Sequence, residues 1–150
     1  MKTVYNYSFV LVFIWIGFVL AISFMEAPLK FRAPSVTTAI GVEIGIIVFN
    51  MLNKIEVVFS VFLLSHIRYV QKTDFKLFVG LLILFAIVGF QSIYLLPILD
   101  GYAELVINGN SSPSNTEHRM YVFLEVIKLF LLFYIGYKQV MFYRKELIKL

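Results

Sequence analysis

The chain has 150 residues, of which 61% are hydrophobic and only 15% are charged, whereas soluble domains carry about 25% charged residues. A soluble domain of this size could not bury so much apolar surface, so the composition predicts an integral membrane protein whose surroundings are lipid. Cysteine is absent, which excludes disulfides and thiolate metal sites. The net charge of +4 comes from basic residues next to the apolar segments. Basic residues at such positions set the membrane topology and bind anionic lipid headgroups, so no nucleic-acid partner is expected.

The first apolar segment covers residues 7–25 and contains no charged residue. It is too long for the apolar region of a typical signal peptide, so we expect it to remain as the first span. Pro28 is expected to end this helix within a loop over residues 27–40. The second span is predicted at residues 41–65, and a basic connection follows it.

The third span is predicted at residues 77–99, and the polar stretch over residues 100–119 is expected to form a loop. The fourth span is predicted at residues 120–142, before a basic tail. Each segment is long enough to cross a bilayer, which takes about 20 residues of α-helix. The sequence therefore predicts an all-α integral membrane protein, with four transmembrane helices in one antiparallel bundle that forms a single domain.

Basic residues are unevenly distributed between the two sides of the predicted membrane. The N-terminus, the second connection and the C-terminus together contain Lys2, Arg68, Lys72, Lys76, Lys138, Arg144, Lys145 and Lys149. The two other connections contain only Lys30, Arg32 and Arg119. Because cytoplasmic segments are enriched in lysine and arginine, both termini are expected in the cytoplasm.

Two of the predicted spans carry polar and charged residues at depth. These residues are Asn50, Asn53, Lys54 and Glu56 in the second span and Glu125 and Lys128 in the fourth. A charge at the bilayer centre costs about 2.5–3.5 kcal/mol even on a lenient insertion scale, so each needs a partner or a function.

Helical spacing indicates which of these side chains share a face. In the second span, intervals of seven and four place Glu43, Asn50 and Lys54 on one stripe, with Asn53 and Glu56 on its flank. In the fourth span, intervals of three, four and three define one stripe through His118, Tyr121, Glu125 and Lys128. We expect both polar stripes to face the interior of the bundle.

When depth is counted from the outer helix ends, two lysines and two glutamates lie at matched levels. We therefore expect the pairs Lys54–Glu125 and Glu56–Lys128, or the alternative pairing, with Gln91 of the third span at a similar level. A paired set is far less costly in hydrocarbon than isolated charges. Spans two and four are accordingly predicted to be neighbours.

A candidate ligand or proton site follows from these stripes, and its residues are Asn50, Asn53, Lys54, Glu56, Gln91, Glu125 and Lys128. Ionisable residues inside a membrane commonly mark binding sites and proton pathways, and polar residues also join helices. Two interpretations therefore stay open. The protein binds or translocates a small solute, an ion or a proton, or it is an accessory or scaffolding subunit that packs in a homo-oligomer or against a partner membrane subunit.

A second group of candidate ligands lies nearer the outer ends of the spans. Glu26, Glu43 and His118, together with Glu125, offer carboxylate and imidazole groups that suit hard or borderline metals. Their spacing lacks the Glu-x-x-His pairs of di-metal bundles, and charges at helix ends have an ordinary interfacial explanation. A metal-dependent membrane protein is therefore a third hypothesis, and no cofactor is predicted.

The sequence lacks common catalytic motifs. It has no phosphate-binding glycine loop, no Gly-x-Ser-x-Gly elbow and no His-Glu-x-x-His zinc helix. An enzyme could work only through the buried glutamates and lysines as acid and base. Because no residue pattern specifies a reaction, the sequence favours a protein that is not an enzyme.

Two stretches carry a resemblance to a known group of proteins. They are residues 15–31, with Glu26-Ala27-Pro28 at the exit of the first span, and residues 49–56, which contain Leu-Asn-Lys-Ile-Glu. These stretches resemble small four-span bacterial inner-membrane proteins of uncharacterised function. The resemblance implies four spans and a bacterial inner membrane, and it implies no catalytic residues.

Overall fold

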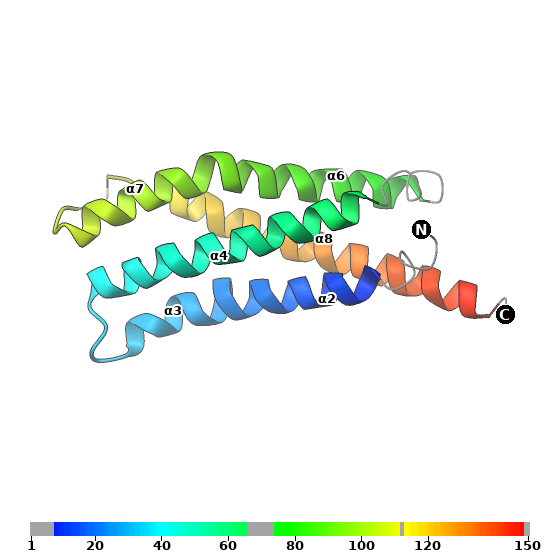
Figure 1. Cartoon of the computed structure of the whole chain (residues 1–150), viewed down its shortest axis with the longest axis horizontal. Coiled ribbons are helices and arrows are strands. Elements are labelled where there is room, and N and C mark those ends of the chain that lie inside the picture. Colours follow the sequence, from blue (N-terminus) through cyan, green and yellow to red (C-terminus); the bar gives the residue numbers. More distant parts are fainter. Residues whose placement is uncertain (1–7, 66–73, 112, 149–150) are drawn as a thin grey trace.

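The computed structural model describes residues 8–65, 74–111 and 113–148. These residues are helical apart from short connections, and no strand occurs among them. Four helical segments are each long and apolar enough to cross a membrane, namely Ser8–Arg32, Thr38–Leu64, Phe75–Ile107 and Thr116–Lys145. They lie side by side along one long axis (Figure 1). The prediction of an all-helical chain with four membrane-length helices is confirmed.

The first span continues past the proline that was expected to end it. It consists of α2 (Ser8–Val19), the π-helix η1 (Leu20–Glu26), α3 (Ala27–Leu29) and the 3₁₀-helix η2 (Lys30–Arg32). A proline ring collides with the carbonyl four residues earlier in an α-helix, which for Pro28 belongs to Phe24 in η1. The N–H of Ala27 donates to the carbonyl of Ile22, five residues back. This wider turn relieves the collision, so the chain stays helical.

The third span repeats this arrangement. It consists of α6 (Phe75–Phe90), the π-helix η3 (Gln91–Leu95) and α7 (Leu96–Ile107), with Pro97 in the first turn of α7. The N–H of Leu96 again donates to a carbonyl five residues back, that of Gln91. The helix therefore extends beyond the predicted end at residue 99, and the connection that follows is shorter than expected.

Caps mark helix ends at two of the connections. Thr37 accepts a hydrogen bond from the N–H of Ile40 at 3.3 Å and starts α4 (Thr38–Leu64). Gly109, with a φ of 81°, ends α7, while the N–H of Asn110 bonds back to Leu105. The last helix, α8, covers Thr116–Leu147.

The order of helices around the bundle differs from the prediction. α8 packs against α2 and α6, whereas α4 packs against α2, α6 and α7. Figure 1 shows α4 passing in front of α8, with α2 along one side of α4 and with α6 and α7 along the other. The expectation that spans two and four are neighbours is therefore wrong. They lie across the bundle from one another, and long side chains bridge the centre between them.

Apolar packing is concentrated in one half of the bundle. The main core cluster contains Val12, Trp15, Ile16, Val19, Leu63, Leu77, Leu81, Leu84, Val88, Leu132 and Ile135. In the other half, towards the connections at residues 33–37 and 108–115, the buried cluster is limited to Leu95, Leu96 and Tyr121. The helices are thus tightly packed at one end and leave room between them at the other.

Candidate functional site

A group of four buried polar side chains lies where the packed and open halves of the bundle meet. We call Glu56, Gln91, Glu125 and Lys128 the central cluster. The ammonium of Lys128 is 2.6 Å from Glu56 Oε1, 2.6 Å from Glu125 Oε1 and 2.9 Å from Gln91 Oε1. Each of these four side chains is at most 1% exposed. One ammonium group thus joins three of the four spans.

Neighbouring side chains hold the two carboxylates in place. The indole N–H of Trp15 donates to Glu56 Oε1 at 2.9 Å, and Gln91 Nε2 donates to Glu125 Oε1 at 2.9 Å. The hydroxyl of Ser23 donates to Glu125 Oε2 at 3.0 Å. Ser23 lies in η1 and Gln91 in η3, so each π-helix directs one polar side chain at the same carboxylate. Such π segments frequently occur at functional sites.

The central cluster has an unbalanced set of ionisable groups. It contains two carboxylates and one ammonium, and Glu56 Oε2 is buried with no hydrogen-bond partner among the described residues. If both glutamates are ionised, the cluster carries one excess negative charge. That charge is strongly disfavoured in a low-dielectric interior unless a proton or another cation neutralises it. The cluster is therefore suited to take up one positive charge.

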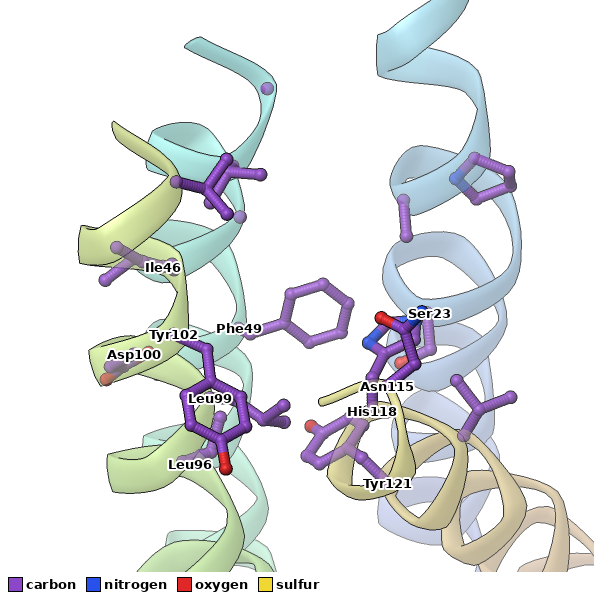
Figure 2. Close-up of a pocket in the computed structure, with 18 of the residues that line it drawn as sticks. Ser23, Ile46, Phe49, Leu96, Leu99, Asp100, Tyr102, Asn115, His118 and Tyr121 are labelled. Carbon is purple, nitrogen blue, oxygen red and sulfur yellow. The ribbon is translucent and has the colours of Figure 1, made fainter. Parts of the chain in front are cut away.

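A cavity of about 620 Å³ reaches Glu125 from the open half of the bundle. In Figure 2, Ile46, Phe49, Leu96, Leu99, Asp100 and Tyr102 lie on one side of it, and Ser23, Asn115, His118 and Tyr121 lie on the other. Most of the lining is apolar or aromatic, and the polar groups are few. The cavity thus combines apolar walls with a buried carboxylate at its inner end, as small-molecule sites commonly do.

Charged groups on the wall add to the negative character of the cavity. Asp100 lines it and accepts a hydrogen bond from Asn50 Nδ2 at 2.8 Å. Lys30 also lines it, but this lysine lies 3.5 Å from Glu26, which balances its charge. The hydroxyl of Tyr121 is buried at the cavity wall and has no hydrogen-bond partner among the described residues. The Glu125 carboxylate lies close to this hydroxyl.

The predicted site residues lie in different places, and only some of them come together. Glu56, Gln91, Glu125 and Lys128 come together, and the predicted pair Glu56–Lys128 is present. Asn53 is buried next to them and accepts a hydrogen bond from Ser92 at 2.6 Å. Asn50 instead donates a hydrogen bond to Asp100 on the wall of the cavity, outside the central cluster.

Lys54 requires a correction. Its side chain is exposed on the outside of the bundle, and no pair between Lys54 and Glu125 is present, because Glu125 binds Lys128. The inward stripe of α4 passes through Asn53, Glu56 and Ser60 rather than through Asn50 and Lys54. The two polar stripes lie about 100° apart on the helix, so they cannot both face the centre.

The proposed metal ligands are not brought together. No three His, Asp or Glu side chains in the described part of the chain are close enough to hold a metal ion. Glu26 pairs with Lys30, Glu43 and His118 are exposed, and Glu125 belongs to the central cluster.

Sequence reasoning missed three polar contributors. The polar stripes of the second and fourth spans indicate neither Trp15 nor Ser23, and Asp100 lies in α7 rather than in the predicted loop over residues 100–119. A buried indole N–H needs an acceptor, so a lone tryptophan in a span opposite a glutamate could have indicated the bond from Trp15 to Glu56. No protein-family model, no curated protein and no solved structure matches the chain. Any functional assignment therefore depends on the geometry of the site.

Proposed function

We propose that the chain crosses a bacterial inner membrane as an antiparallel four-helix bundle with cytoplasmic termini, and that it binds a small, largely apolar cation in its cavity. The observation that carries this proposal is the buried Glu125 at the inner end of an apolar cavity of about 620 Å³. Ligand pockets of about 300–1,000 Å³ with few polar groups typically bind compounds of drug-like size. The cavity volume therefore supports a small organic ligand rather than a bare ion.

The charge of the site supports a cation in preference to an anion. Asp100 and Glu125 line the cavity, Glu56 lies directly behind, and Lys128 neutralises only one of them. Tyr102 and Tyr121 add aromatic faces, which attract cations through their ring quadrupoles, and the ammonium of Lys30 already lies 5.7 Å from the centre of the Phe49 ring. A ligand with its positive charge near Glu125 and its apolar groups against the walls fits both the negative charge and the apolar lining of the cavity.

A proton would compete with such a cation. Either one neutralises the excess negative charge of the central cluster, so binding of the cation is expected to release a proton when one is bound. We therefore expect the affinity for the cation to decrease as the pH is lowered. The exchange of a proton for the cation follows from the charge balance of the central cluster and needs no additional residue.

The proposal is tested by equilibrium binding of tetraphenylphosphonium to the full chain purified in mild detergent. Glu125→Gln is expected to weaken binding about 10–100-fold, because a charge-assisted contact is worth about 1.5–3 kcal/mol. Glu104→Gln is the matched control, since Glu104 is exposed on α7 and does not line the cavity. Equal binding by wild type and Glu125→Gln, or equally tight binding of an uncharged analogue of the same shape, would contradict the proposal.

A role as an accessory subunit of a larger membrane complex is the second candidate. The exposed position of Lys54 on α4 favours it, because a charge on the outside of a membrane bundle needs a partner. Both functions can coexist in one chain, since the cavity and Lys54 lie on different faces of α4.

A further inference from the structure

Lys54 is a charged residue on the outer face of α4, close to the middle of that helix. α4 has 27 residues from Thr38 to Leu64, so its central residue is Met51, and Lys54 lies about 4.5 Å further along the axis. If α4 crosses about 30 Å of hydrocarbon, Lys54 starts about 10 Å from the nearer boundary. An extended lysine side chain reaches about 6 Å, so snorkelling alone does not bring the ammonium to the interface.

The described part of the chain offers Lys54 no internal partner. Glu56, only two residues along, faces inward and binds Lys128, and Glu125 is also buried in the central cluster. The nearest exposed carboxylate on α4 is Glu43, eleven residues and about 16 Å away along the axis. Among the described residues, no hydrogen bond or ion pair involves the ammonium of Lys54. In a bilayer it would face lipid as an isolated charge.

The surface around Lys54 has the pattern of a helix-packing seam. Ile47, Met51, Lys54, Val58 and Val61 follow intervals of four, three, four and three, and we call these five residues the α4 seam. Ile47 is 65% exposed and Val58 is 64% exposed, and α2, α6 and α7 contact other faces of α4. Alternating intervals of three and four let two helices pack along their length, and one polar residue in such a seam selects its partner.

We infer that the α4 seam docks a transmembrane helix of a different membrane protein, one that carries an aspartate or glutamate at the depth of Lys54. Charge complementarity is the reason. The ammonium is already removed from water, so a carboxylate that meets it in the seam neutralises it without further desolvation of the lysine.

A second copy of this chain fits the seam less well. Two seams packed in parallel would bring two Lys54 ammonium groups together, and the seam contains no carboxylate. The exposed carboxylates in the described part of the chain, Glu43 and Glu104, lie near helix ends. The inference rests on the proposed insertion of α4 into a bilayer, but it does not depend on cation binding in the cavity.

The test is photocrosslinking in membranes of the source organism. The photoreactive residue p-benzoylphenylalanine replaces Val58 in the seam or, as a matched control, Phe130 on α8, which is 73% exposed. We expect Val58 to give one discrete protein adduct and Phe130 to give lipid adducts, which also show that the chain is inserted. The captured protein must contain a transmembrane aspartate or glutamate.

Substitutions at Lys54 then test the role of its charge. Lys54→Met is expected to reduce the adduct at Val58 at least tenfold, and Lys54→Arg is expected to retain it. Lys54→Glu is expected to lose the adduct and to regain it when the partner's carboxylate is exchanged for lysine. Because Lys54 is exposed, Lys54→Met should keep the helical content and the tetraphenylphosphonium binding of the wild type.

Three results would overturn the inference. The first is that Val58 gives only lipid adducts, as Phe130 does, which would show a lipid-facing surface. The second is an adduct of twice the mass of this chain, which would show a second copy. The third is an adduct that persists unchanged in Lys54→Met.

Discussion

Lys128 is the residue on which the interior of the bundle depends most directly. Its ammonium lies between two buried carboxylates, 2.6 Å from each, and all three side chains are at most 1% exposed. Removing one member of a buried ionic group leaves the others without compensation, which is more damaging than replacing the whole group.

Lys128→Met is therefore expected to lower the free energy of unfolding by about 3–5 kcal/mol. The measurement is an SDS titration of the purified protein followed by circular dichroism, with Lys145→Met as the control, because Lys145 is exposed near the end of α8. A triple variant that adds Glu56→Gln and Glu125→Gln should recover most of the loss. If the triple variant regains stability but does not bind the cation, the charges have a functional role. If Glu56→Gln and Glu125→Gln fail to fold, the network is structural.

Among the elements, the start of α6 contains an ion pair that should respond to pH. Asp74 accepts hydrogen bonds from the N–H of Leu77 at 3.1 Å and from Lys138 Nζ at 2.8 Å. The hydrogen bond from Lys138 lowers the pKa of the Asp74 carboxyl below its ordinary value of 3.8. Because the pKa is lower in the folded chain, ionised Asp74 contributes stability above pH 3.8, and this contribution is lost as the pH falls through the folded pKa.

Asp74→Asn is expected to remove this part of the pH dependence while keeping the helix cap, since asparagine also caps helices well. The measurement is thermal unfolding between pH 2 and pH 5, roughly the range over which a salt-bridged aspartate exchanges its proton. Asp74→Ala should lose both the cap and the pH dependence. An unchanged pH profile in Asp74→Asn would show that the pair with Lys138 contributes nothing.

The end of α7 gives a second prediction at this scale. Gly109 has a φ of 81°, a conformation that an L side chain adopts at a cost of about 1–2 kcal/mol. Gly109→Ala is expected to destabilise the fold by roughly that amount, as measured by SDS titration. Gly101→Ala is the matched control, because Gly101 lies inside α7 with no neighbouring atom within 4 Å of an added Cβ, and it should be neutral or slightly stabilising. Equal effects of the two substitutions would contradict this explanation.

At the scale of the whole molecule, the uneven packing of the bundle creates the cavity. Apolar side chains fill one half, while Phe49 and Tyr121 contact each other across part of the other half at 5.7 Å between ring centroids. The central cluster lies at the boundary, so it is shielded on one side by the core and reached on the other through the cavity. Figure 2 shows this open region between the two pairs of helices.

Filling the cavity should therefore abolish binding without disturbing the cluster. Ala103 lines the cavity on α7, and Ala103→Trp is expected to weaken tetraphenylphosphonium binding more than tenfold through steric exclusion. Ala86→Trp is the control, since Ala86 is exposed on α6 and does not line the cavity. If Ala103→Trp binds the cation as wild type does, the ligand lies elsewhere.

The sequence by itself determined that the chain is helical, how many membrane-length helices it has, and which ionisable residues need partners. These properties follow from composition and length, because apolar segments of this size have few alternatives to a helix in lipid. The pair between Glu56 and Lys128 and the inward position of Gln91 also followed from matched depths.

Only the tertiary structure decided how each helix is rotated and where it ends. α4 is apolar on most of its circumference, so its sequence did not distinguish the stripe with Glu56 from the stripe with Lys54. Contacts between elements, such as that of the Phe31 ring with Gly41, set the rotation instead. The π turns before Pro28 and Pro97 likewise depend on packing along the whole span, and they direct Ser23 and Gln91 at Glu125. The rotation of each helix and the wider π turns arise from contacts between residues that are far apart in the sequence. The periodicity of a single segment therefore cannot predict them.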